Sequence, residues 1–299
     1  MALRDILVCT DGTTAGEVRF QLALNLAQAS KAHLTSIYAL RAARGSVDPP
    51  AGVGIPPTVF GPVSPEGARA MERQPISAAA PVASVPSEGE RADTVEERFR
   101  EELQLRGLDG EWLILDHTDL TKLIELAEAA DLAILGQHTG DNSDGVTWLR
   151  PDNVVTAVGR PVLVVPYAGT FALVGTRVLI AWDGTREANA LHDALPLIGN
   201  AEAVTVMHVG THEADLDRAR PRLERVVRHL QRHGVKAQPE ETLCGDITIS
   251  DVLLSRTADL GADMIVAGAY HHSQLREALL GGVSRDLLDH MTVPVLMSH

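Results

Sequence analysis

Short apolar runs alternate along the chain with longer segments in which apolar residues recur every three or four positions. The runs Ile6 to Thr10 and Val178 to Trp182 are rich in β-branched residues and flanked by turn residues, as is typical of buried parallel strands. Helical spacing follows each run, at Val18, Leu22, Leu26 and Ala29 and again at Ala188, Leu191, Leu195 and Ile198. This alternation predicts an α/β fold with a parallel sheet and right-handed crossovers.

The later segments repeat the same order of elements. Second strands are predicted at "HLTSIYAL" and "AVTVMHV", and third strands at "EWLILD" and within "VKAQPEETL". Pro239 in the last of these indicates an irregular or edge strand. Helices predicted over 120–130 and 247–260 lead into fourth strands. Ligands of such sheets bind beyond the carboxyl ends of the strands, where the strand order reverses.

Three pairs of segments are similar to each other and occur in the same order. "DILVCTDGT" begins at Asp5 and "RVLIAWDGT" at Arg177, and "DLAILGQHT" begins at Asp131 and "DMIVAGAYH" at Asp263. "RPVLVVP" and "VPVLMSH" follow as the third pair. We therefore predict a tandem duplication of two Rossmann-like, doubly wound domains, 1–170 and 171–299, each with a five-stranded mostly parallel sheet.

One segment of the first copy has no counterpart in the second. Residues 42–92 contain nine of the sixteen prolines, mixed with Gly, Ala and Ser and without a sustained apolar period. This composition predicts a flexible insertion. Tolerated growth of a surface loop is the simpler interpretation, and a lid or a partner-binding segment is the alternative.

Composition excludes several classes of function. The net charge of -14 argues against binding to nucleic acid, and no apolar run is long enough to predict a membrane span. The first residues are not typical of a secretory leader. Cys9 and Cys244, the two cysteines, form no CxxC motif. We expect a cytoplasmic protein with both thiols reduced.

The repeated strand that ends in Asp-Gly-Thr, the "ADMIVAGA" segment and the closing "HMTVPVLMSH" resemble tandem members of the universal stress protein family. The resemblance implies that Val162–Val165 and Val295–Met297, the last strands of the two domains, pair within the chain, and it leaves a homodimer open. In the ATP-binding branch, a carboxylate after strand one holds the adenosine, and it corresponds to Asp11 and Asp183. A phosphate loop, G-x2-G-x9-G-[ST], follows strand four.

The second copy matches this loop in part. Gly268 and Gly281 are at the first and third glycine positions, His271 replaces the second glycine, and Gly282 replaces Ser/Thr. Glycines allow backbone N–H groups to approach a phosphate, Ser284 could cap the next helix, and His271 could either block or bind a phosphate. We expect ATP or another adenine nucleotide, with Mg²⁺ as its only metal, at Asp183, Gly184, Gly268, His271, Gly281, Gly282 and Ser284. Asp11 and Gly12 are the corresponding candidates in the first copy.

The loop of the first copy departs further from the pattern. Thr139 and Leu149 replace glycines, and Arg150 replaces Ser/Thr. The nearby acids would repel a triphosphate unless a cation intervenes; they are Asp141, Asp144 and Asp152. We expect this copy to have lost nucleotide binding, and we interpret Asp141, Asn142 and Asp144 as a solvated loop.

No catalytic constellation is recognised, so at most slow ATP hydrolysis is expected. The leading interpretation is a regulatory or protective binding protein of the stress response. A nucleotide-free interaction module, with vestigial sites in both domains, is the alternative. A third interpretation, a metal-dependent hydrolase, would use His271, His272, His290 and His299, whose spacing matches no zinc signature.

Overall fold

The computed structural model describes residues 2–40, 87–116, 118–138, 149–184, 188–269 and 282–298. The elements of the first half are β1 (Asp5–Thr10), α1 (Thr14–Ser30), β2 (His33–Ala39), α2 (Glu88–Arg106), β3 (Gly110–Leu115), α3 (Leu120–Ala129), β4 (Leu132–Gly136), α4 (Pro151–Val158) and β5 (Val162–Val165). Those of the second half are β6 (Arg177–Ala181), α5 (Ala188–Ile198), β7 (Ala203–Gly210), α6 (Glu213–Arg232), β8 (Ala237–Leu243), α7 (Ile249–Leu260), β9 (Met264–Gly268), α8 (Gly282–His290) and β10 (Val295–Ser298).

The strands form one ten-stranded sheet in the order β3-β2-β1-β4-β5-β10-β9-β6-β7-β8. Each half contributes five parallel strands in an equivalent order, and the halves meet at β5 and β10, which pair antiparallel. The predicted α/β fold class is confirmed. Within each half the order reverses beside the first strand, between β1 and β4 and between β6 and β9. These two switch points are where a ligand site is expected.

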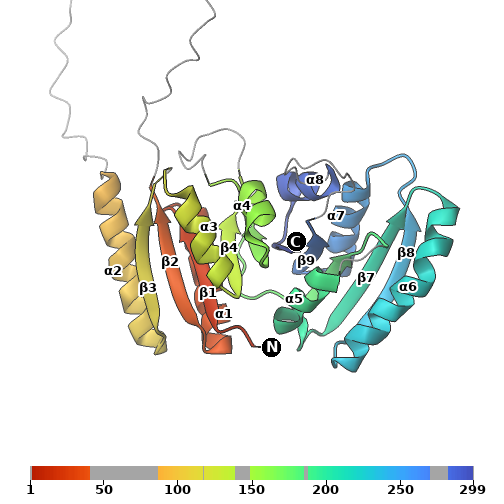
Figure 1. Ribbon diagram of the computed structural model, residues 1–299, viewed down its shortest axis with the longest axis horizontal. Coiled ribbons are helices and arrows are strands. Elements are labelled where there is room, and N and C mark those ends of the chain that lie inside the picture. Colours follow the sequence, from red (N-terminus) through yellow and green to blue (C-terminus); the bar gives the residue numbers. More distant parts are fainter. Residues whose placement is uncertain are drawn as a thin grey trace, which may run out of the picture.

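Helices cover both faces of the sheet, and alternate strand residues point to opposite faces (Figure 1). Ile6 and Val8 belong to a core cluster that includes residues of α1, α2, α5 and α6, whereas Leu7 and Cys9 belong to one that includes residues of α3, α4, α7 and α8. Each half therefore has two helices on each face. This double cover explains why the strands are almost continuously apolar.

Two sequence predictions need correction at the level of single residues. Helix α2 begins at Glu88, within the range predicted as insertion, because Ser87 and Glu90 form a capping box there. In α1 the predicted stripe is partly wrong, since Ala29 is exposed and Arg19 is buried. A charged residue on the buried face cannot be found from apolar spacing alone. Residues 42–86 of the predicted insertion lie outside the described residues.

One other expectation agrees with the structure. Strand β8, which contains Pro239, lies at the edge of the sheet and pairs with β7 alone. This position suits proline, which lacks a backbone N–H for a second neighbour. Among the described residues, the helices are too short or too polar to cross a membrane.

Candidate functional site

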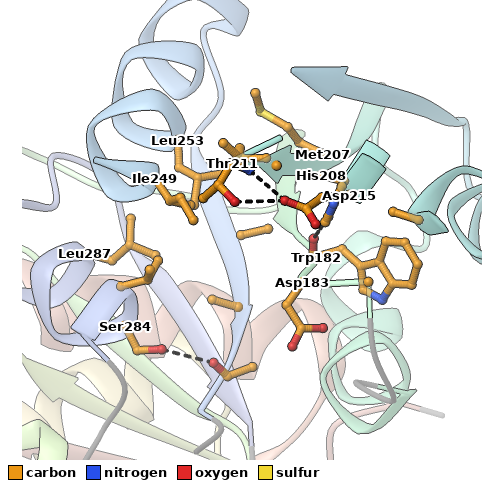
Figure 2. Close-up of a pocket in the computed structure, with 18 of the residues that line it drawn as sticks. Trp182, Asp183, Met207, His208, Thr211, Asp215, Ile249, Leu253, Ser284 and Leu287 are labelled. Carbon is orange, nitrogen blue, oxygen red and sulfur yellow. Dashed lines mark hydrogen bonds between the residues drawn. The ribbon is translucent and has the colours of Figure 1, made fainter. Parts of the chain in front are cut away.

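A pocket of about 750 Å³ opens at the carboxyl ends of the strands of the second half (Figure 2). Its walls come from β6, β7, β9 and helices α6, α7 and α8. The described residues that line it include Trp182, Asp183, Gly184, Met207, His208, Val209, Thr211, Asp215, Arg218, Arg222, Ile249, Leu253, Gly268, Gly282, Val283, Ser284 and Leu287. The pocket thus lies at the switch point between β6 and β9.

Asp183 and Gly184 form the wall that follows β6. Asp183 is exposed at the pocket, and Gly184 adopts a left-handed conformation with φ of 87°. A Cβ at Gly184 would also lie 3.4 Å from Cε1 of His208. The backbone conformation therefore favours glycine after Asp183, whereas the distance to the ring is an ordinary van der Waals contact. The turn leaves the Asp183 carboxylate at the mouth of the pocket, as Figure 2 shows.

The opposite wall comes from β9 and the first turn of α8. The Ser284 hydroxyl donates to the Gly268 carbonyl at 3.2 Å and thereby ties α8 to the end of β9. Helix α8 already begins at Gly282, so the expectation that Ser284 caps this helix is wrong. A Cβ at Gly282 would meet no described atom within 4 Å. Five predicted residues (Asp183, Gly184, Gly268, Gly282 and Ser284) therefore line one pocket.

Trp182 and His208 form a buried part of the wall that the sequence analysis did not identify as a pair. Nδ1 of His208 lies 3.0 Å from the Trp182 carbonyl, and the two rings meet edge to face. Because a carbonyl only accepts, Nδ1 carries the proton of this bond. Trp182 is 4% exposed and belongs to the hydrophobic core. The indole ring therefore packs in the core behind the pocket wall.

Helix α6 supplies the charged wall. The Asp215 carboxylate accepts from the Thr211 hydroxyl at 2.8 Å and the His212 backbone N–H at 3.0 Å, and these bonds lower its pKa. Arg218 donates to Asp215, and Arg222 donates to the Gly184 carbonyl at 3.0 Å. Arg222 thus connects α6 to the turn that carries Asp183. The apolar stripe in this part of the sequence predicts a helix with a basic solvent face, but it does not show which arginines reach the pocket.

The corresponding place in the first half is occupied by a side chain of the protein itself. Nη2 of Arg19 lies 2.7 Å from Oδ2 of Asp11, and Nε of Arg19 donates to the Cys9 carbonyl. Asp11 also accepts from the backbone N–H and the hydroxyl of Thr13. Although burial opposes it, the nearby guanidinium and these bonds keep the Asp11 pKa below its usual value. Asp11 is therefore an ionised, internally paired residue.

The Arg19 guanidinium also lies against Gly136 at the end of β4, because a Cβ added at Gly136 would collide with it. It therefore lies at the switch point between β1 and β4. The residue in the equivalent position of the second half is Leu191 on α5. Leu191 carries no charge and packs in the core, so the pocket beside Asp183 stays open.

The open pocket lies in the half of the chain for which the sequence comparison finds a family. Residues 176–299 match the model of the universal stress protein family. The pocket therefore lies within the segment that matches this family model. No curated protein matches the chain.

Solved structures extend the likeness in fold to the whole chain. A universal stress protein from Archaeoglobus fulgidus DSM 4304 is 13% identical, with a TM-score of 0.65 over 98% of this chain and 96% of that one. A functionally unknown protein from Pseudomonas aeruginosa PAO1 is 20% identical, with a TM-score of 0.57 over 99% of this chain and 92% of that one. At these identities the comparisons establish the fold alone.

Several residues considered in the sequence analysis lie outside the described residues: His271, Gly281, Thr139, Asp141, Asn142 and Asp144. In the first half, Leu149 packs against the core and Arg150 precedes α4 in an extended conformation, paired with Asp152. Gly12 has a φ of 67° and a Cβ there would lie 3.2 Å from the Tyr38 hydroxyl. Within the described residues, no three His, Cys, Asp or Glu side chains are arranged to hold a metal ion.

Proposed function

We propose that this chain is a stress-response binding protein that holds one adenine nucleotide, in the pocket of its universal stress protein domain. The observation that supports this most is the open pocket beside Asp183, in contrast to the first-half position that Arg19 fills. On this proposal the protein regulates or protects through its bound state rather than through catalysis.

The walls of the pocket suit the three parts of a nucleotide. Apolar side chains offer a surface to the flat base; they are Met207, Val209, Ile249, Leu253 and Leu287. The Asp183 carboxylate can accept hydrogen bonds from ribose hydroxyl groups. Phosphates suit the amino end of α8, where the helix dipole and backbone N–H groups attract anions and Gly282 leaves room. Mg²⁺ would enter with ATP and needs no protein site of its own.

Thermal unfolding with and without MgATP tests the proposal. A ligand at about 100 times its Kd stabilises the folded state by about 2.7 kcal/mol, so the Tm should rise by several degrees. Asp183→Asn and Gly282→Val should remove this rise, because the first weakens the ribose acceptor and the second projects a branched side chain into open space. Asp217→Asn is the matched control, since Asp217 lies on α6 and pairs with Arg220.

Titration calorimetry should give one site per chain, and native mass spectrometry of protein purified without ligand shows whether nucleotide is retained. An unchanged Tm with MgATP, ADP and AMP, together with an empty chain, would overturn the proposal. That result would favour the nucleotide-free interaction module.

We also assign the protein to the cytoplasm. Cys9 and Cys244 are both free thiols, which suits a reducing compartment. Burial raises the pKa of the Cys9 thiol to about 12, so this thiol has no redox role. Fractionation of cells should recover the protein with the cytoplasmic fraction, and recovery with an exported fraction would contradict the assignment.

A further inference from the structure

Three histidine rings contact each other on the helices that cover one face of the second half. His192 belongs to α5, His229 lies in the last turn of α6, and His233 caps that helix. The ring centroids of His192 and His229 are 5.1 Å apart, and those of His229 and His233 are 4.6 Å apart. Both pairs meet edge to face, so His229 lies between the other two rings.

The central ring is poorly placed to become charged. Nε2 of His229 is buried and has no hydrogen-bond partner among the described residues. A protonated imidazole has two N–H donors, so protonation would leave a buried donor at Nε2 without an acceptor. His192 and His233, on either side of it, are exposed at the surface.

The charged and titratable groups that act on His229 come from both helices of the contact. They are His192 from α5 and His233 and Arg232 from α6. Burial, followed by these groups, lowers the pKa of His229. The carboxyl end of α6 would favour a cation and so acts in the opposite direction. Among the described residues, these rings do not form a metal site. We therefore consider protonation of the cluster.

We propose that the cluster of His192, His229 and His233 is a proton-sensitive contact that loosens the packing of α6 against α5 when the protein enters an acidic environment. Neutral rings pack edge to face and hold the two helices together. Acidification forces a cation into the middle of the cluster, where Nε2 of His229 has no acceptor among the described residues. This property does not depend on nucleotide binding.

The sign of the effect follows from proton linkage. The unfolded chain binds a proton at His229 near pH 6.5, the usual imidazole pKa, whereas the folded chain binds it only at lower pH. Stability is therefore complete above about pH 6.5, and it falls as the pH decreases from there to the folded pKa. Below the folded pKa the loss is constant.

The test measures Tm between about pH 8 and pH 5 for the wild type, His229→Phe and His229→Gln. His290→Gln, a histidine at the end of α8, is the matched control. The wild type and the control should lose Tm below about pH 6.5, and both His229 variants should lose clearly less. Hydrogen exchange at low pH should quicken in the last turns of α6 of the wild type and not in His229→Phe.

Two results would overturn the proposal. One is an equal loss of Tm in the wild type and both His229 variants. The other is an NMR titration of wild-type His229 with a pKa at or above about 6.5. The NMR measurement uses the wild-type chain and decides the question even if a variant folds poorly.

Discussion

Asp11 and Asp183 occupy the same place in the two halves, directly after the first strand of each, yet their surroundings differ. Asp11 is paired with Arg19, whose side chain is 5% exposed, while Asp183 is exposed at a pocket of about 750 Å³. The difference comes from α1 and α5: Arg19 on α1 reaches back to the aspartate, and Leu191 on α5 turns into the core.

This comparison shows that a shared motif does not define a shared site. Both halves carry Asp-Gly-Thr, and both glycines have a positive φ, so the local turn is preserved. Accessibility is decided by a residue of the following helix. Arginine there supplies a permanent internal counter-ion, whereas leucine supplies no charge to the aspartate.

Arg19→Leu should have the largest effect, because it makes the first half resemble the second while leaving Asp11 without its main partner. Removing one member of a buried ion pair costs about 3 kcal/mol of unfolding free energy, measured by urea denaturation. Arg100→Leu, which breaks an exposed pair with Glu96, should cost less than about 0.5 kcal/mol.

The pH dependence of this loss of unfolding free energy gives a second test of Arg19→Leu. Because the Asp11 pKa is lowered in the folded wild type, its stabilisation is present above the unfolded value of about 3.9 and disappears as the pH falls through the folded pKa. The wild type and Arg19→Leu should therefore converge in acid. A difference in unfolding free energy between the two chains that grows in acid would contradict the role of Arg19 as the partner of Asp11.

Binding of a second nucleotide by Arg19→Leu would contradict the expectation that the first half has lost nucleotide binding.

Leu191→Arg reverses the comparison by placing a guanidinium in the second half. It should pair with Asp183 as Arg19 pairs with Asp11 and so compete with the nucleotide. We expect at least a tenfold weaker Kd in calorimetry, which is about 1.4 kcal/mol. Leu191→Met keeps an uncharged chain of similar volume and serves as the control. An unchanged Kd in Leu191→Arg would show that Asp183 does not contact the ligand.

Tyr38→Phe should have the smallest effect. The Tyr38 hydroxyl donates to Glu88 at 3.1 Å, while His208, in the equivalent position of the second half, contacts the Trp182 carbonyl. Removing the hydroxyl should lower the unfolding free energy by about 1 kcal/mol in urea denaturation. Tyr167→Phe, at a tyrosine that is 58% exposed, should change almost nothing. Equal effects of the two variants would show that the bond to Glu88 does not stabilise α2.

Much of the fold could be predicted because it depends on local patterns. The apolar runs predicted the strands, the repeated Asp-Gly-Thr predicted equivalent turns, and Pro239 predicted an edge strand. The start of α2 was missed because it depends on a capping box and not on apolar spacing. Ser87 and Glu90 form this box inside the range that was predicted as insertion.

The site could be predicted only for residues that directly follow a strand, because their position in the sequence places them at the strand ends. Asp183, Gly184 and Gly268 follow directly from strand position, so their shared location could be expected. Arg19, Arg222 and the histidine cluster could not, because each depends on how a side chain crosses from one element to another. An arginine at a buried helical position, such as Arg19, is the signal in the sequence that could have indicated an internal ion pair.

The antiparallel pairing of β5 with β10 has a consequence for folding during translation. Strand β5 emerges from the ribosome long before β10, and all four of its residues are buried in the finished sheet. Until β10 arrives, the first half exposes an apolar edge with unpaired backbone groups, which invites association with other nascent chains. Chaperone protection is therefore needed most while the second half is still being translated.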